Sequence, residues 1–167
     1  MIYILTGDIR SGKTTALFHW IEGREDVEGL LCPDDKTGKR CFLKVKSKQE
    51  FKLEIESGND IEMDKIVVIG PFQFLKSAFE KANDYLISIS NKSSSKFIII
   101  DELGKLELKN KGLHDAASKL TSNKTFNTKH LILVVRSSHL NKIIEHYKLS
   151  EYTLIRKEEL NAIGKKI

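Results

Sequence analysis

Two acidic side chains stand directly after an apolar run in FIIIDELGKLEL, residues 97–108. The run at 97–100 predicts a buried strand, and Asp101 and Glu102 follow it. Carboxylates at the end of such a strand need a cation, a proton or hydrogen-bond donors, because an unpaired buried charge is costly. The pair therefore indicates a metal or catalytic site, and the alternative is that it caps a following helix.

The segment GDIRSGKTT matches the pattern G-x-x-x-x-G-K-[ST] over residues 7–14. An apolar run precedes it and a helical pattern follows, which is typical of a loop that binds phosphates through backbone N–H groups at a helix N-terminus. Lys13 is expected to neutralise β- and γ-phosphate oxygens, and Thr14 to offer its hydroxyl to Mg²⁺. The residues expected to contact the nucleotide are Gly7, Asp8, Ile9, Arg10, Ser11, Gly12, Lys13, Thr14 and Thr15.

This loop suggests a role for the acidic pair. In phosphate-loop folds a second acidic strand ends beside the phosphates, so Asp101 is expected to hold Mg²⁺ together with Thr14. Glu102 is then the candidate catalytic group, which polarises a water for in-line attack on the γ-phosphate. Lys13 and Glu102 are therefore the two catalytic residues that the sequence predicts.

An acid directly after the metal-binding aspartate is typical of the ATPase branch, which inserts a strand between the two motif strands. The apolar run at 130–135 is the candidate for that strand. Arg136 and Ser137 follow this run, and one interpretation is that either of them faces the γ-phosphate. The alternative is that Ser137 or Ser138 caps the next helix.

The elements that position these residues alternate between strands and helices. Strands are predicted at 2–5, 65–70, 97–100, 130–135 and 152–155, and helices at 14–23, 75–89, 113–120, 137–148 and 157–163. Pro71 is expected in the first turn of the second helix. The stretch 27–55 shows period-two patterning and predicts antiparallel strands inserted after the first helix. We expect one α/β domain over 1–167, with a mainly parallel sheet and helices on both faces.

Composition narrows the class of protein. With 167 residues, 40% hydrophobic and 31% charged, the chain is typical of a globular domain. No apolar run approaches the ~20 residues needed to cross a bilayer. The first residues do not resemble a signal peptide and there are two cysteines, so a cytoplasmic location is expected.

The net charge of +5 favours anionic partners only mildly. The stretch 36–48 is rich in lysine and also contains Arg40 and Phe42. A phosphate-facing lid or a nucleic-acid patch is one interpretation. The other, which we prefer for the lysines, is a solvated edge protected against strand addition. Nucleic acid is therefore not an expected partner, and Arg40 is kept as a candidate site residue.

The motif DELGKLEL, residues 101–108, resembles the second motif of a family of small phosphate-loop nucleoside-triphosphatases of the thermophile type, which includes the cancer-related nucleoside-triphosphatase. The stretch GLLCPDDKTGKRCF, residues 29–42, also resembles a family segment, with Gly38, Arg40 and Phe42 in place and Cys41 where glycine is usual. The resemblance implies a RecA-like fold with an antiparallel hairpin near the nucleotide. It also implies Mg²⁺-dependent hydrolysis of ATP, GTP or other triphosphates to diphosphate and phosphate, with loose base preference.

Three hypotheses remain open at this point. The first is a nucleoside-triphosphatase, the second a small kinase that passes the γ-phosphate to a nucleoside, nucleotide or other metabolite, and the third a nucleotide-gated binding or nucleic-acid accessory protein. A kinase is favoured by the small size and the basic hairpin and disfavoured by the lack of a recognisable arginine-rich lid. The accessory protein would bind RNA or DNA with an affinity that falls steeply with salt.

Overall fold

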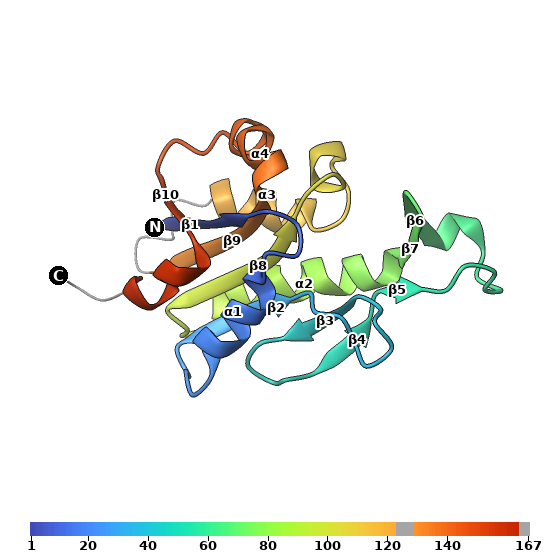
Figure 1. The fold of residues 1–167 in the computed structure, drawn as a ribbon, viewed down its shortest axis with the longest axis horizontal. Coiled ribbons are helices and arrows are strands. Elements are labelled where there is room, and N and C mark those ends of the chain that lie inside the picture. Colours follow the sequence, from blue (N-terminus) through green and yellow to red (C-terminus); the bar gives the residue numbers. More distant parts are fainter. Residues whose placement is uncertain (123–128, 164–167) are drawn as a thin grey trace.

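The computed structural model describes residues 1–122 and 129–163. Its larger sheet has the strand order β10-β1-β9-β8-β2-β3-β4 (Figure 1). Neighbours from β10 to β2 run parallel, and β3 and β4 add antiparallel pairs at one edge. The strands are β1 (Ile2–Gly7), β2 (Val27–Leu31), β3 (Cys41–Lys44), β4 (Glu50–Lys52), β8 (Phe97–Leu103), β9 (His130–Arg136) and β10 (Tyr152–Ile155).

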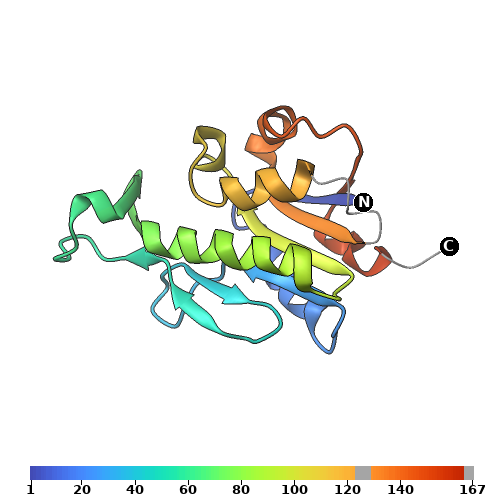
Figure 2. The same cartoon turned by 180° about the vertical axis from the view of Figure 1, so that it is seen from behind.

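Helices cover both faces of this sheet, as Figures 1 and 2 show from opposite sides. One face packs against α1 (Lys13–Ile21) and the 3₁₀ helix η4 (Lys157–Ala162). The other packs against α2 (Lys76–Lys92), α3 (His114–Ser122) and α4 (Leu140–His146). Three further 3₁₀ helices are short: η1 (Met63–Lys65), η2 (Glu107–Lys109) and η3 (Ser137–His139). The predicted α/β fold class is confirmed.

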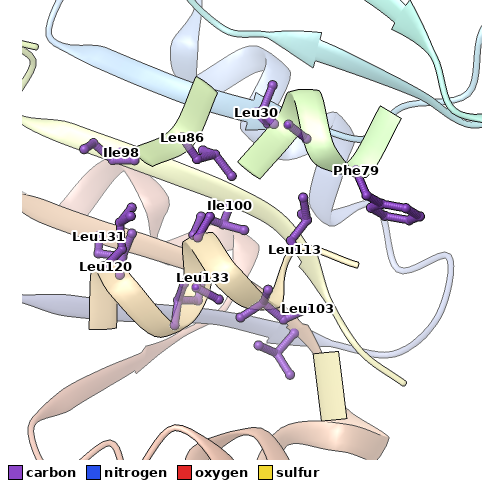
Figure 3. Packing of buried hydrophobic residues seen from close by; sticks show 14 of the residues in the cluster. Leu30, Phe79, Leu86, Ile98, Ile100, Leu103, Leu113, Leu120, Leu131 and Leu133 are labelled. Atoms are coloured by element: carbon purple, nitrogen blue, oxygen red, sulfur yellow. The ribbon is translucent and has the colours of Figure 1, made fainter. Parts of the chain in front are cut away.

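The apolar run before the acidic pair forms the centre of the core. Successive side chains of a strand point to opposite faces, so Ile98 and Ile100 of β8 pack toward α2 and α3 while Phe97 and Ile99 pack toward α1. All four are fully buried, which is why the strand reads as a continuous apolar run rather than an alternating one. Figure 3 shows Leu86 of α2 among the buried side chains next to Ile98 and Ile100.

The inserted strand predicted at 130–135 is confirmed. It forms β9, which pairs in parallel with β1 on one side and with β8 on the other. The register places Arg136 opposite Gly7, the first residue of the phosphate loop. The strand order therefore brings the end of β9 to the same edge of the sheet as the loop and the acidic pair.

The prediction of antiparallel strands throughout 27–55 is wrong for β2. This strand pairs in parallel with β8, with Gly29 opposite Ile99, and only its other edge pairs antiparallel with β3. Gly29 has φ +125°, and a Cβ there would lie 2.2 Å from the Ile99 carbonyl oxygen. A short buried strand carries no local signal for its direction, because direction follows from which neighbour it pairs with.

The strand predicted at 65–70 forms, but outside the main sheet. It becomes β6 (Ile66–Ile69), which pairs antiparallel with β7 (Phe72–Leu75), and β5 (Glu54–Ile55) completes a three-stranded sheet. The prediction that Pro71 lies in the first turn of a helix is therefore wrong. Pro71 lies in the two-residue turn of this hairpin, after Gly70 at φ +56°. A proline has no N–H to lose in such a turn. In Figure 1 the small sheet lies far from both termini.

Candidate functional site

The predicted phosphate loop connects β1 to α1, and its shape favours glycine at position 12 and leaves little room for a side chain at position 7. Gly12, at the N-cap of α1, has φ +84°, a conformation that side chains with a Cβ rarely adopt. A Cβ on Gly7 would lie 2.8 Å from Ser11 Oγ, closer than van der Waals contact allows. The Ser11 hydroxyl is buried and lacks a hydrogen-bond partner among the residues that the structure describes. An unpaired buried hydroxyl inside this loop fits an anion that would accept from it.

Lys13 lies within the loop rather than in solvent, with 6% of its surface exposed. Its Nζ donates to the carbonyl oxygens of Gly7 at 3.1 Å and Asp8 at 2.8 Å. Burial lowers the pKa of Lys13, while the carboxylates of Glu102 and Asp101 act in the opposite direction. The ammonium group is thus held at the loop by weak carbonyl acceptors, which phosphate oxygens can replace.

Thr14 and Asp101 meet although they are 87 positions apart in the chain: Thr14 Oγ1 donates to Asp101 Oδ2 at 2.9 Å. The backbone N–H of Cys32 donates to the same oxygen at 3.1 Å. Asp101 is 1% exposed, and burial raises its pKa to about 6, although these two hydrogen bonds act in the opposite direction. The alternative that Asp101 caps a helix is wrong, because β8 continues to Leu103 and the carboxylate binds these other donors.

A hydroxyl and a carboxylate oxygen in contact suit Mg²⁺, which prefers oxygen ligands. Thr14 and Asp101 would hold the ion together with substrate phosphates and water, since Mg²⁺ retains several waters in such sites. The part of the chain that the structure describes has no cluster of three or more His, Cys, Asp or Glu side chains suited to a metal. A larger protein cage is not needed when the nucleotide supplies ligands.

Glu102 follows Asp101 but points elsewhere. The pairing register of β8 with β9 shifts between Ile100 and Leu103. An irregularity of this kind re-aims side chains at the end of a strand. Glu102 Oε1 accepts from Arg136 Nε at 2.5 Å, so the residue at the end of the inserted strand meets the candidate base.

The structure places Ser137 against the phosphate loop and not at a helix cap. Its Oγ donates to Asp8 Oδ1 of the phosphate loop, and η3, which begins at Ser137, has no side-chain cap. Arg136 and Ser137 therefore both contact residues of the predicted site. The sequence did not predict either contact, because it was equally compatible with a residue that faces the γ-phosphate and with a serine that caps the next helix.

The predicted residues surround a cavity of about 440 Å³, the phosphate cavity. Gly7 and Asp8 lie beside it through their contacts with Lys13, and Asp101 lies behind Thr14. The rest of its lining comes from Phe18, Arg136 and the segment 29–42, where Arg40 Nη1 donates to the Cys32 carbonyl at 2.9 Å. The predicted residues that line it directly are Ile9, Arg10, Ser11, Gly12, Lys13, Thr14, Thr15 and Glu102.

One contact at the loop was missed at the sequence level. Lys157 of η4 donates from Nζ to the Ser11 carbonyl at 2.8 Å, although 146 positions separate the two residues. The short segment 157–162 carries charged residues that read as an ordinary exposed helix. Only the pairing of β10 beside β1 brings this lysine to the loop.

A family model described as NTPase matches residues 2–167. The chain belongs to the NTPase family. The resemblance stated from the second motif is thereby confirmed. Among curated proteins, no significant sequence match was found.

Two solved structures of other proteins share the fold of this NTPase-family chain. The crystal structure of THEP1 from the hyperthermophile Aquifex aeolicus superposes with a TM-score of 0.73 at 19% identity, over 98% of this chain and 96% of that one. The solution structure of a human cancer-related nucleoside triphosphatase gives 0.70 at 17% identity, over 99% and 98%. Within the described ranges no helix has the length and apolarity to span a membrane.

Proposed function

We propose that this NTPase-family protein is a Mg²⁺-dependent nucleoside-triphosphatase that converts a triphosphate to the diphosphate and phosphate. The observation that carries the proposal is the contact between Thr14 and Asp101 beside the buried Lys13 ammonium. Lys13 and Thr14 line the phosphate cavity from the start of α1, and Asp101 of β8 lies directly behind Thr14, so that together they are suited to a metal-bound triphosphate. The family match and the fold shared with a human nucleoside triphosphatase support it.

The phosphate loop binds the substrate in this proposal. Backbone N–H groups at the start of α1 face the phosphates, and Lys13 exchanges its carbonyl acceptors for phosphate oxygens. Thr14 and Asp101 hold Mg²⁺, which neutralises charge on the phosphates when bound. Asp101 must be ionised for that role, and at neutral pH it is, because its pKa is about 6.

Glu102 positions the attacking water and accepts its proton. A carboxylate that lines the phosphate cavity can accept this proton once it is released from its ion pair with a basic side chain. In the structure it is paired with Arg136, and a γ-phosphate offers that guanidinium a competing anionic partner. Arg136 and Arg40 then neutralise charge that develops on the transferred group, a role worth roughly 10³–10⁵ in rate for arginine in related chemistry.

We infer a loose base preference and a cytoplasmic location. Apolar side chains of Ile9 and Phe18 line the phosphate cavity. A base packed on such surfaces is not discriminated by its hydrogen-bonding edge. Both cysteines, Cys32 and Cys41, are free thiols, in keeping with a reducing compartment.

The test is product analysis with ATP, GTP, CTP and UTP, each with Mg²⁺ and with EDTA. Release of phosphate is expected with several of the four and only with the metal. Lys13→Ala should weaken triphosphate binding by roughly 1.5–3 kcal/mol, because a charge-assisted contact is lost. Lys46→Ala, at an exposed lysine outside the loop, is the matched control and should keep both binding and turnover. Phosphate release that survives EDTA or Lys13→Ala contradicts the proposal.

A further inference from the structure

A second cavity of about 330 Å³ adjoins the phosphate cavity. Arg40, Glu102 and Arg136 line both, so these three side chains form the wall between them. Sites for small molecules commonly occupy roughly 300–1,000 Å³. We name this second space the aromatic chamber. Hydrolysis of a triphosphate makes no use of it, because water needs no cavity of this size.

Four phenylalanines give the chamber its apolar wall. Phe42 comes from β3, Phe79 from α2, and Phe72 and Phe74 from β7 of the small sheet. The ring centroids of Phe42 and Phe79 are 5.7 Å apart, and those of Phe74 and Phe79 are 6.3 Å apart. Such rings present flat faces and edges to a planar aromatic ligand. The small sheet thus supplies half of this wall, although it is separate from the main sheet.

Two arginines, a lysine and two carboxylates also line the chamber. Arg40, Arg136 and Glu102 stand at the wall shared with the phosphate cavity, whereas Lys105 and Glu107 line the chamber and not the phosphate cavity. Glu102 is paired with Arg136, and Glu107 accepts from the backbone N–H of Gly104 at 2.7 Å and of Leu113 at 2.8 Å.

Glu107 is therefore already satisfied by its own loop, and it is 3% exposed. The ion pair with Arg136 offsets the charge of Glu102. Arg40 pairs with Asp34, Nε to Oδ1 at 3.3 Å, but the two side chains are 38% and 60% exposed, and a pair so exposed contributes only about 0–1 kcal/mol. A phosphate can therefore compete for the guanidinium of Arg40, and the ammonium of exposed Lys105 adds a second positive charge. An aromatic wall opposite a cationic end matches a planar base that carries a phosphate.

We propose that the aromatic chamber binds a nucleoside monophosphate, which receives the γ-phosphate of the triphosphate in the adjoining cavity. The proposal rests on the proposed function for the triphosphate site and adds a second substrate to it. The base packs among the phenylalanines, and its phosphate lies at Arg40 and Lys105, directed across the shared wall. Arg136 lies between the two phosphates and reduces their repulsion.

The transfer balances without a further reactant. An ionised phosphate oxygen of the monophosphate forms a bond to the γ-phosphorus, and the bond from that phosphorus to the β–γ bridging oxygen breaks. The leaving group is the first diphosphate and the product is a second diphosphate. No proton has to move, because the attacking oxygen is already ionised.

The experiment incubates the protein with Mg²⁺, ATP labelled at the γ-phosphate, and GMP, CMP, UMP or AMP in separate reactions. Label is expected in the diphosphate of the acceptor and in free phosphate, and the ratio of the two is measured. Lys13→Ala protein, purified in the same way, identifies transfer due to a contaminant. Label that persists in the acceptor with Lys13→Ala overturns the proposal.

Two pairs of exposed residues test the chamber without disturbing the core. Lys105→Ala and Phe72→Ser alter it, whereas Lys109→Ala and Val68→Ser alter a neighbouring cavity only. Phe72 and Val68 are matched in exposure, at 48% and 49%. The ratio of labelled diphosphate to free phosphate should fall about tenfold in Lys105→Ala, where a charge-assisted contact is lost. It should fall in Phe72→Ser and stay at the parent value in both controls.

Free phosphate alone, with millimolar monophosphate present, overturns the acceptor and leaves the triphosphatase intact. A parallel set of reactions contains the nucleosides in place of the monophosphates, and label on a nucleoside hydroxyl but not on a monophosphate overturns the proposal too, in favour of a different acceptor. If no triphosphate is consumed in any reaction, the proposed function fails. Calorimetry with GMP then tests separately whether the aromatic chamber binds a monophosphate. Binding by the parent protein that is lost in Lys105→Ala supports the proposed monophosphate site, and absence of binding in the parent protein overturns it.

Discussion

Arg136 Nε lies 2.5 Å from Glu102 Oε1, and both side chains line the phosphate cavity. Their side chains are 34% and 25% exposed, so water screens the pair. An ion pair at such exposure contributes only about 0–1 kcal/mol. A triphosphate can therefore separate the two side chains at little cost in free energy, and the ion pair does not prevent nucleotide binding.

Glu102→Gln should bind triphosphates with the affinity of the parent protein and hydrolyse them roughly 10²–10⁴-fold more slowly, because glutamine cannot accept the proton of the attacking water. Single-turnover rates and calorimetric affinities measure the two effects separately. Glu50→Gln, at an exposed carboxylate on β4, is the control and should leave both unchanged. Parent-like turnover in Glu102→Gln would show that another group activates the water.

Arg136→Ala should lower kcat for hydrolysis by more than tenfold and leave the diphosphate affinity nearly unchanged, because the guanidinium acts on the γ-phosphate. Arg136→Lys should recover only part of the rate, since lysine keeps the charge but not the planar pair of donors. Comparing triphosphate and diphosphate affinities in the three proteins checks this. Equal losses in both affinities would indicate a general structural role instead.

Gly29→Ala should lower the free energy of unfolding by more than about 2 kcal/mol, since the new methyl group would meet the β8 backbone and overpacking alone costs about 1–3 kcal/mol. Strand β8 carries the acidic pair, so this close approach positions the site. Gly58→Ala, at φ +79° with open space around it, isolates the cost of the backbone conformation. Denaturant unfolding of both variants measures the difference, and equal losses would mean that the clash is relieved.

Stability should rise with pH around the ordinary pKa of histidine. Burial, the N-terminal ammonium and the charge of Lys96 lower the pKa of His130 below 6.5, so the unfolded chain binds this proton more readily than the folded protein. The stability that neutral His130 contributes is lost as pH falls through that range, with a slope of at most about 1.4 kcal/mol per pH unit. Asp101 acts in the opposite direction below its pKa of about 6, because there the folded protein binds its proton more readily than the unfolded chain. Urea unfolding from pH 6 to 7.5 should therefore show the rise due to His130.

His130→Phe should flatten the rise, because the ring packs against Tyr3 and Phe97 and phenylalanine keeps those contacts without a proton. His19→Gln, at an exposed histidine on α1, should not change the slope. An unchanged slope in His130→Phe would assign the pH dependence to other groups. His139 is the next to test, because burial also lowers its pKa.

The inserted strand was predictable from the sequence and the small sheet was not. The run at 130–135 is apolar throughout, as expected for a strand buried on both faces, and an acid after Asp101 indicated its position between β1 and β8. The hairpin of β6 and β7 was read as a strand followed by a helix, because Pro71 is compatible with a helix start and with a tight turn alike. The longer-range pairing of β7 with β5 decided between them.

The sequence by itself determined the phosphate loop, since its glycines, lysine and threonine are contiguous and the loop's shape follows from local backbone geometry. Only the tertiary structure decided what that loop faces. The meetings of Thr14 with Asp101, Glu102 with Arg136 and Ser11 with Lys157 join residues 87, 34 and 146 positions apart. Such contacts depend on strand order and direction, which are set by packing across the whole sheet rather than by any local pattern.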